Sequence, residues 1–196
     1  DGDGDGDIVS GAADGSIVFW ENVAGRYSRI EPSPAGSISA AGGNSVVAFG
    51  DLDGDGVTDI CVGAKYDDDG GNRRGAVYIL FLNAAGSVRV QQKLSSLSYG
   101  IENALVNLDS FGTSIALLTP GNGTHSGPPV LAIGAGMHNQ NSEGKLMMMT
   151  LKPLVRVPDG TVRWQSYLSA LPAMPSYGQN GLFGRSIAAI GDVDGD

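Results

Sequence analysis

Four aspartates close together in the stretch DLDGDGVTD form the clearest candidate for chemistry in this chain. Asp51, Asp53 and Asp55 alternate with other residues, the glycines that follow the last two permit a tight turn, and Asp59 closes it. Alternating carboxylates that converge on one point suit a hard cation, because Ca²⁺ takes six to eight oxygen ligands. We therefore predict a calcium site formed by these four side chains and the backbone carbonyl of Val57.

The residues that follow this loop exclude an EF-hand. Val62 stands at the twelfth position, where an EF-hand loop has a bidentate glutamate. The segment Ile60–Val62 is apolar and largely β-branched, which favours a strand. The loop is therefore expected to connect two strands. Its calcium would have a structural role, because it fixes the loop and neutralises carboxylates that repel each other.

Similar acidic runs occur at both ends of the chain. The first residues repeat the pattern of Asp53 to Ala64, and the last residues repeat the segment that leads into Asp51 and its first ligands. These runs supply the remaining predicted metal ligands: Asp1, Asp3, Asp5, Asp7, Asp192, Asp194 and Asp196. A further loop, Thr119 to Pro129, has no carboxylate and is expected to hold no ion. Internal repeats that contain several short strands each indicate propeller blades.

These repeats resemble the FG-GAP repeats of the integrin α-subunit propeller and its microbial and algal relatives. Phe111-Gly112 and Phe183-Gly184 match the FG of that pattern, and the GA pairs are Gly11-Ala12, Gly63-Ala64 and Gly134-Ala135. The sequence departs from the pattern after GA, where Ala13, Lys65 and Gly136 replace the proline, and at Gly42-Gly43, which lacks the Phe. The resemblance implies calcium-stabilised β-propeller blades and an extracellular or cell-surface location.

The predicted fold is all-β, with about three four-stranded antiparallel FG-GAP β-propeller blades. Propellers close with four to eight blades, so we expect a segment of a larger propeller or repeat array. The expected units are a partial first blade (1–41), a second blade with the complete calcium loop (42–110), a third with a degenerate loop (111–182), and the start of the next (183–196). The expected strands are Ile8–Ser10, Ser16–Glu21, Arg26–Ile30, Ser45–Gly50, Asp59–Gly63, Ala76–Leu82, Val88–Leu94, Ser114–Leu118, Val130–Gly134, Lys145–Leu151 and Val162–Tyr167.

Composition restricts the classes of partner. The formal net charge is −9, and one Ca²⁺ in each of three loops would reduce it to about −3. The acidity is therefore interpreted as a demand for cations, and nucleic acid is disfavoured as a partner. The only cysteine, Cys61, lies within a predicted strand, so it is expected to be a buried, inert thiol. No apolar run reaches the roughly 18 residues of a membrane span.

No residue pattern supports catalysis, so the chain is not expected to be an enzyme. His125 and His138 lie in glycine-rich or polar loops, without a nucleophile at a spacing that suggests a triad. The acidic run Asp67–Asp69 is interpreted as a solvated loop rather than an acid/base pair. Asn122 begins the sequon Asn-Gly-Thr and is the candidate glycosylation site.

Trp20 and Trp164 are expected to pack within or between blades, although a role in sugar binding stays open. The run Met147–Met149 is expected to fill the core.

The function that these features favour is adhesion, or a structural role in a surface or filament assembly, through contacts with other proteins or with neighbouring copies of the module. The alternative is a carbohydrate-binding or polysaccharide-active propeller domain. An exposed aromatic side chain beside a basic or acidic cluster would favour that alternative.

Overall fold

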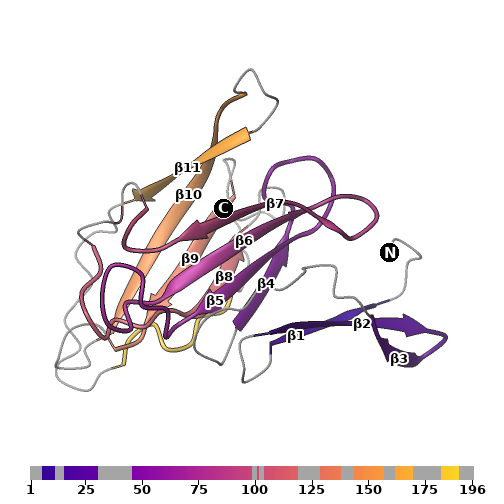
Figure 1. The fold of residues 1–196 in the computed structure, drawn as a ribbon, viewed down its shortest axis with the longest axis horizontal. Helices are drawn as coiled ribbons and strands as arrows, with labels where there is room; N and C mark the ends of the chain where they lie inside the picture. Colours follow the sequence, from indigo (N-terminus) through magenta and orange to yellow (C-terminus); the bar gives the residue numbers. More distant parts are fainter. Residues whose placement is uncertain are drawn as a thin grey trace, which may run out of the picture.

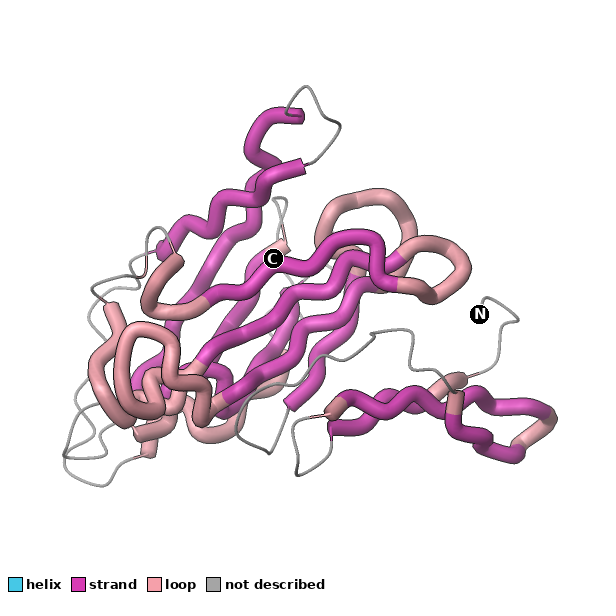
Figure 2. Tube along the Cα trace, in the orientation of Figure 1, coloured by secondary structure: helices cyan, strands magenta, loops and turns pink. Residues whose placement is uncertain are grey.

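The computed structural model describes residues 6–11, 16–30, 46–98, 101, 104–118, 129–137, 144–156, 162–169 and 182–189. These residues form eleven β-strands, with no helix among them (Figure 2). The all-β prediction is therefore confirmed, and the described part of the chain contains no helix long and apolar enough to cross a membrane. The strands are β1 (Ile8–Gly11), β2 (Ile17–Val23), β3 (Arg26–Arg29), β4 (Val46–Gly50), β5 (Asp59–Ala64), β6 (Ala76–Leu82), β7 (Val88–Leu94), β8 (Phe111–Leu118), β9 (Val130–Ala135), β10 (Lys145–Arg156) and β11 (Val162–Ser169).

The strands form three antiparallel sheets in which neighbours in the chain are also neighbours in the sheet (Figure 1). We call them the N-terminal sheet (β1–β3), the central sheet (β4–β7) and the C-terminal sheet (β8–β11). Two have the four strands of a propeller blade, and three strands of the N-terminal sheet lie among the described residues. All eleven strands lie where the sequence predicted them, apart from shifts at their ends. The largest shifts are at β8, which begins at Phe111, and at β10, which continues to Arg156.

The central sheet is covered on both faces. Strand β6 is buried along its whole length, as its continuous apolar sequence predicts for a strand between blades. Its side chains alternate between two hydrophobic clusters. Val77, Ile79 and Phe81 pack in a cluster shared with the C-terminal sheet, and Ala76, Tyr78, Leu80 and Leu82 pack in one shared with the N-terminal sheet.

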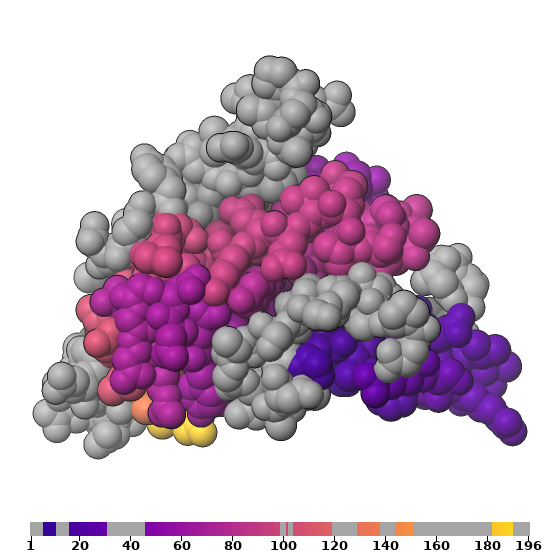
Figure 3. Space-filling view, in the orientation of Figure 1, coloured from indigo at the N-terminus to yellow at the C-terminus, as the bar shows by residue number. Residues whose placement is uncertain are grey.

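The two outer sheets contribute differently to these clusters. The C-terminal sheet supplies Phe111, Ile115, Leu131, Ile133, Met147 and Met149. The N-terminal sheet supplies Ile17 and Phe19. This sheet meets the central sheet where β1 lies next to β4, and Figure 3 shows it in indigo at one end of the molecule. Met147, Met149 and Cys61 are buried, as predicted, whereas Met148, between the two methionines, is only half-buried.

The FG and GA pairs form the joint between the central and C-terminal sheets. Gly75, which precedes β6, forms a parallel bridge with Phe111 at the start of β8. Gly63 lies so close to Gly112 that a Cβ on Gly63 would overlap the Gly112 carbonyl oxygen. The FG of one blade therefore packs directly against the GA of the preceding blade.

The same joint recurs one blade later. Gly144 forms a parallel bridge with Phe183, and a Cβ on Gly134 would overlap the carbonyl oxygen of Gly184. In both joints the missing side chain allows two backbones to approach closely. The repeat seen in the sequence is thus a repeated packing arrangement between successive sheets.

Candidate metal centre

The loop that joins β4 to β5 carries the aspartates singled out by the sequence. Gly54 and Gly56 have φ angles of +79° and +85°. A residue with a side chain adopts such left-handed conformations only at a cost. The alternating Asp-Gly pattern therefore lets the chain turn sharply while every second residue is an aspartate.

The aspartates hold the loop in shape through their own backbone. Asp51 accepts hydrogen bonds from the amides of Gly54 (2.7 Å) and Gly56 (3.0 Å). The Asp55 amide donates to Asp53 (3.2 Å), and the Val57 amide donates to Asp55 (2.8 Å). Such local carboxylate-to-amide bonds are the usual way in which Asp stabilises turns. They hold the backbone turns of the loop in place.

Asp59 differs from the other three aspartates because it is fully buried. One carboxylate oxygen accepts a hydrogen bond from the Leu52 amide (2.9 Å) and the other from the Leu82 amide (3.0 Å). Burial raises the pKa of Asp59 to about 6, the two amide bonds oppose this shift, and the charges of Asp53 and Asp55 add to it. A buried carboxylate with this pKa is one whose negative charge an adjacent cation would stabilise.

Carboxylate oxygens of Asp51, Asp53 and Asp59 all lie within 4.8 Å of one another. Oxygens that bind one Ca²⁺ at 2.3–2.6 Å are at most about 5 Å apart, so this spacing fits the ion. The donors are all hard oxygens, and each keeps lone-pair capacity beyond its amide bond. The residues therefore fit calcium, which would be held by these three carboxylates.

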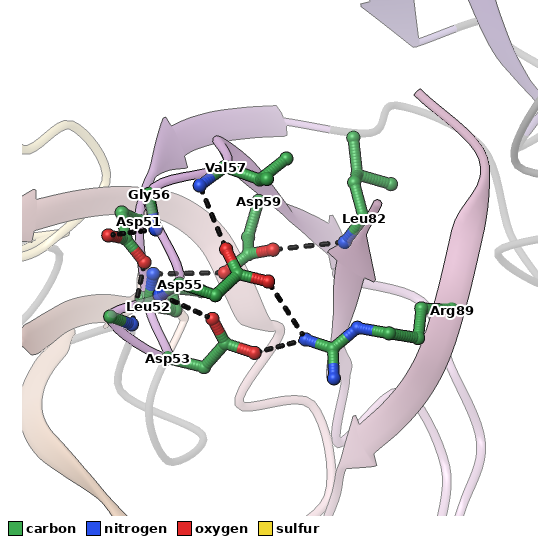
Figure 4. A network of polar contacts seen from close by, with 10 residues as sticks. Asp51, Leu52, Asp53, Asp55, Gly56, Val57, Asp59, Leu82 and Arg89 are labelled. Atoms are coloured by element: carbon green, nitrogen blue, oxygen red, sulfur yellow. Dashed lines mark hydrogen bonds and ion pairs between the residues drawn. The ribbon is translucent and has the colours of Figure 1, made fainter. Parts of the chain in front are cut away.

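The fourth predicted carboxylate faces another partner. Asp55 lies 3.3 Å from the guanidinium of Arg89 on β7, and the same guanidinium contacts Asp53 (Figure 4). Asp55 is thus in the loop but outside the set of three converging carboxylates. Val57 lies in the same loop and is half-buried. Sequence reasoning missed Arg89, because nothing in the spacing from the loop to β7 indicates this contact.

The N-terminal acidic run repeats part of this geometry. Asp7 accepts a hydrogen bond from the Asn22 amide (3.0 Å). Asp7 directly precedes Ile8 as Asp59 directly precedes Ile60, and Ile8 pairs with Trp20 as Ile60 pairs with Leu80. Asn22 therefore occupies the place of Leu82, and the same aspartate-to-amide bond forms in two sheets. The remaining predicted residues, Asp1, Asp3, Asp5, Asp192, Asp194, Asp196 and Asn122, lie outside the described residues.

The prediction of a solvated loop at Asp67–Asp69 is wrong for Asp67, which is only 2% exposed. The Lys93 ammonium lies 2.8 Å from Asp67 and 2.7 Å from Asp69, and the Tyr78 hydroxyl donates a hydrogen bond to Asp67 (3.4 Å). Burial lowers the pKa of Lys93, but its bonds to Asp67, Asp69 and Tyr78 outweigh burial and raise it. Asp67 is buried because a lysine from β7 pairs with it.

Comparison with known proteins agrees with the repeat pattern. Residues 1–62 match the model of the FG-GAP-like repeat. This range includes the whole Asp51–Asp59 loop and the acidic run at Asp7. No curated protein matches the chain significantly. The matched repeat, the all-β structure and the blade-like sheets together identify residues 1–62 as carrying an FG-GAP-like repeat, in a chain built from propeller-type blades.

Proposed function

We propose that this chain is an extracellular repeat module that calcium stabilises and that serves adhesion, or a surface or filament assembly, through protein contacts. The convergence of Asp51, Asp53 and Asp59 carries the calcium part of this proposal, and the FG-GAP-like repeat of residues 1–62 supports the adhesive or assembly role. Bound calcium would fix the loop between β4 and β5 and offset the cost of the buried Asp59 charge. Its role is structural rather than catalytic, since each aspartate of the loop also holds backbone amides.

Thermal unfolding with and without calcium tests this proposal. Calcium at 100 times its Kd stabilises by about 2.7 kcal/mol, which raises the Tm of a chain of this size by about 5–10 °C. Asp51→Asn should abolish most of this rise, because it removes a ligand charge without disturbing Arg89. Asp68→Asn is the matched control. Asp68 is exposed and also accepts a backbone amide bond, from Arg73, but lies outside the loop.

A calcium-dependent rise that survives in Asp51→Asn, or that disappears equally in Asp68→Asn, would contradict the assignment of the site. A wild-type chain whose Tm ignores calcium would contradict the calcium role altogether.

One observation favours carbohydrate binding as a second candidate function. On β3 the Tyr27 side chain is exposed, and the exposed Arg29 lies two residues along, on the same face of the strand. An exposed aromatic ring on the same face as a cation suits an acidic sugar. Binding of an acidic polysaccharide that Tyr27→Ala abolishes would support this candidate. Binding that is unchanged in Tyr27→Ala would exclude this surface as the sugar site.

A further inference from the structure

Arg89 reaches the calcium loop because of an irregularity in the central sheet. Strands β6 and β7 pair Phe81 with Val90 and Leu82 with Val88, so Arg89 is an extra residue in β7 with no partner opposite. This is a β-bulge, which bends a strand locally and changes the direction of a side chain. The bulge lies next to Leu82, whose amide bonds to Asp59.

The N-terminal sheet shows the same hairpin without the bulge. Asn22 corresponds to Leu82, and it pairs with Tyr27 while Glu21 pairs with Ser28, with no residue skipped. The extra residue is therefore a feature that the central sheet has and the N-terminal sheet lacks. The extra residue is Arg89, whose side chain contacts Asp53 and Asp55 of the acidic loop.

Arg89 acts on the loop as a cation. Its guanidinium contacts both Asp53 and Asp55 (Figure 4). The Asp53 side chain is only 7% exposed, whereas that of Arg89 is 40% exposed. Asp55, which the sequence pattern predicts as a calcium ligand, points to Arg89 and not to the three converging carboxylates.

We propose that Arg89 competes with calcium for Asp53 and Asp55, and so sets the calcium affinity of this loop. The inference rests on the proposed calcium function and deepens it. Without calcium, the guanidinium offsets one of the two negative charges of Asp53 and Asp55 and links both side chains to β7. When calcium binds, Asp55 turns from Arg89 towards the ion, and the guanidinium is released into solvent.

The competition has a direct physical consequence. A fixed positive charge beside the site opposes the entry of a divalent cation, and the loss of the Arg89–Asp55 contact offsets part of the binding energy. Arg89 therefore lowers the affinity, in the direction of the weak sites typical of extracellular calcium modules. Because Arg89 is partly exposed, salt should screen its effect.

Calorimetric titration of the full chain with CaCl₂ tests this inference. Arg89→Gln should tighten the Kd by about tenfold at low ionic strength, and by less in high salt. It should also lower the Tm in calcium-free buffer, since the carboxylates lose their internal counter-ion. Arg26→Gln is the matched control, because it removes the same charge from an exposed position on β3, and its Kd should equal that of the wild type.

A second variant guards against a folding defect. Arg89→Lys keeps the positive charge but loses the fork that contacts two carboxylates, so its Kd should fall between those of the wild type and Arg89→Gln. An unchanged or weaker affinity in Arg89→Gln, with calcium still bound by the wild type, overturns the competition alone. If neither protein binds calcium, the proposed function itself fails.

Discussion

At Asp59, burial has opposite effects with and without calcium. A bound ion would stabilise the buried carboxylate, whereas without the ion its negative charge lowers the stability of the fold. The pKa of this carboxyl is about 6 in the folded chain, above its ordinary value of 3.8. An acid whose pKa is raised by folding contributes stability when it is protonated, and this contribution is lost as the pH rises through the folded-state value. The calcium-free protein should therefore lose stability between pH 4 and pH 7.

The size of this effect follows from the shift. A change from 3.8 to about 6 corresponds to at most about 3 kcal/mol of unfolding free energy. With saturating calcium the trend should reverse, because the ion binds the ionised carboxylate and protons compete with it at low pH. Urea unfolding between pH 4 and pH 8, with and without calcium, measures both slopes. Asp59→Asn should lack the calcium-free slope, and a wild-type slope in that variant would refute the assignment.

The sequence predicted the identity of the loop residues but not all of their contacts. The alternation of Asp51, Asp53 and Asp55 with glycine was visible because it is local. The contact of Arg89 with the loop was not, since it depends on a bulge in a strand more than thirty residues away. The burial of Asp67 was also missed, because its partner Lys93 lies on β7 and is distant in the sequence.

At the scale of elements, the joint between the sheets depends on glycines that another residue can replace only at a cost in stability. Gly112 has a φ of +86°, and a Cβ there would lie 2.5 Å from the Ala76 carbonyl oxygen. Gly112→Ala should therefore combine backbone strain of about 1–2 kcal/mol with overpacking of about 1–3 kcal/mol. Chemical denaturation should show a loss of about 2–5 kcal/mol in unfolding free energy.

Gly86 provides the control for this prediction. It has a similar φ of +75°, but a Cβ there would meet nothing within 4 Å. Gly86→Ala should cost only the strain, about 1–2 kcal/mol. Equal losses in the two variants would mean that the close approach of the blades at Gly112 contributes nothing to stability.

The strands themselves were predicted well from the sequence, because runs such as Ala76–Leu82 are apolar and bounded by turn residues. The ends were predicted less well. Strand β8 begins at Phe111 because this residue pairs with Ala135 ahead of a bulge, and Ser114 then pairs with Gly134. Pairing of this kind depends on the partner strand, so the local pattern does not reveal it.

At the scale of the whole molecule, the three sheets differ in how firmly they are joined. The cluster between the central and C-terminal sheets takes residues from many strands of both. The cluster on the other face of the central sheet receives Ile17 and Phe19 as its buried residues from the described part of the N-terminal sheet, with Val9 partly buried against it. The sequence pattern predicted blades, but it did not show this asymmetry, which arises from packing between sheets.

This asymmetry predicts how the molecule opens. Phe81→Ala removes a fully buried ring from the cluster that joins the central and C-terminal sheets, and should cost about 3–5 kcal/mol. Hydrogen exchange should then show protection lost together in β5, β6, β8 and β9, because these strands share one core. Phe19→Ala should reduce protection mainly in β1–β3 and leave β8 and β9 nearly unchanged. If Phe19→Ala lowered protection of β9 as much as that of β2, the N-terminal sheet would unfold with the rest, and the three sheets would form one cooperative unit.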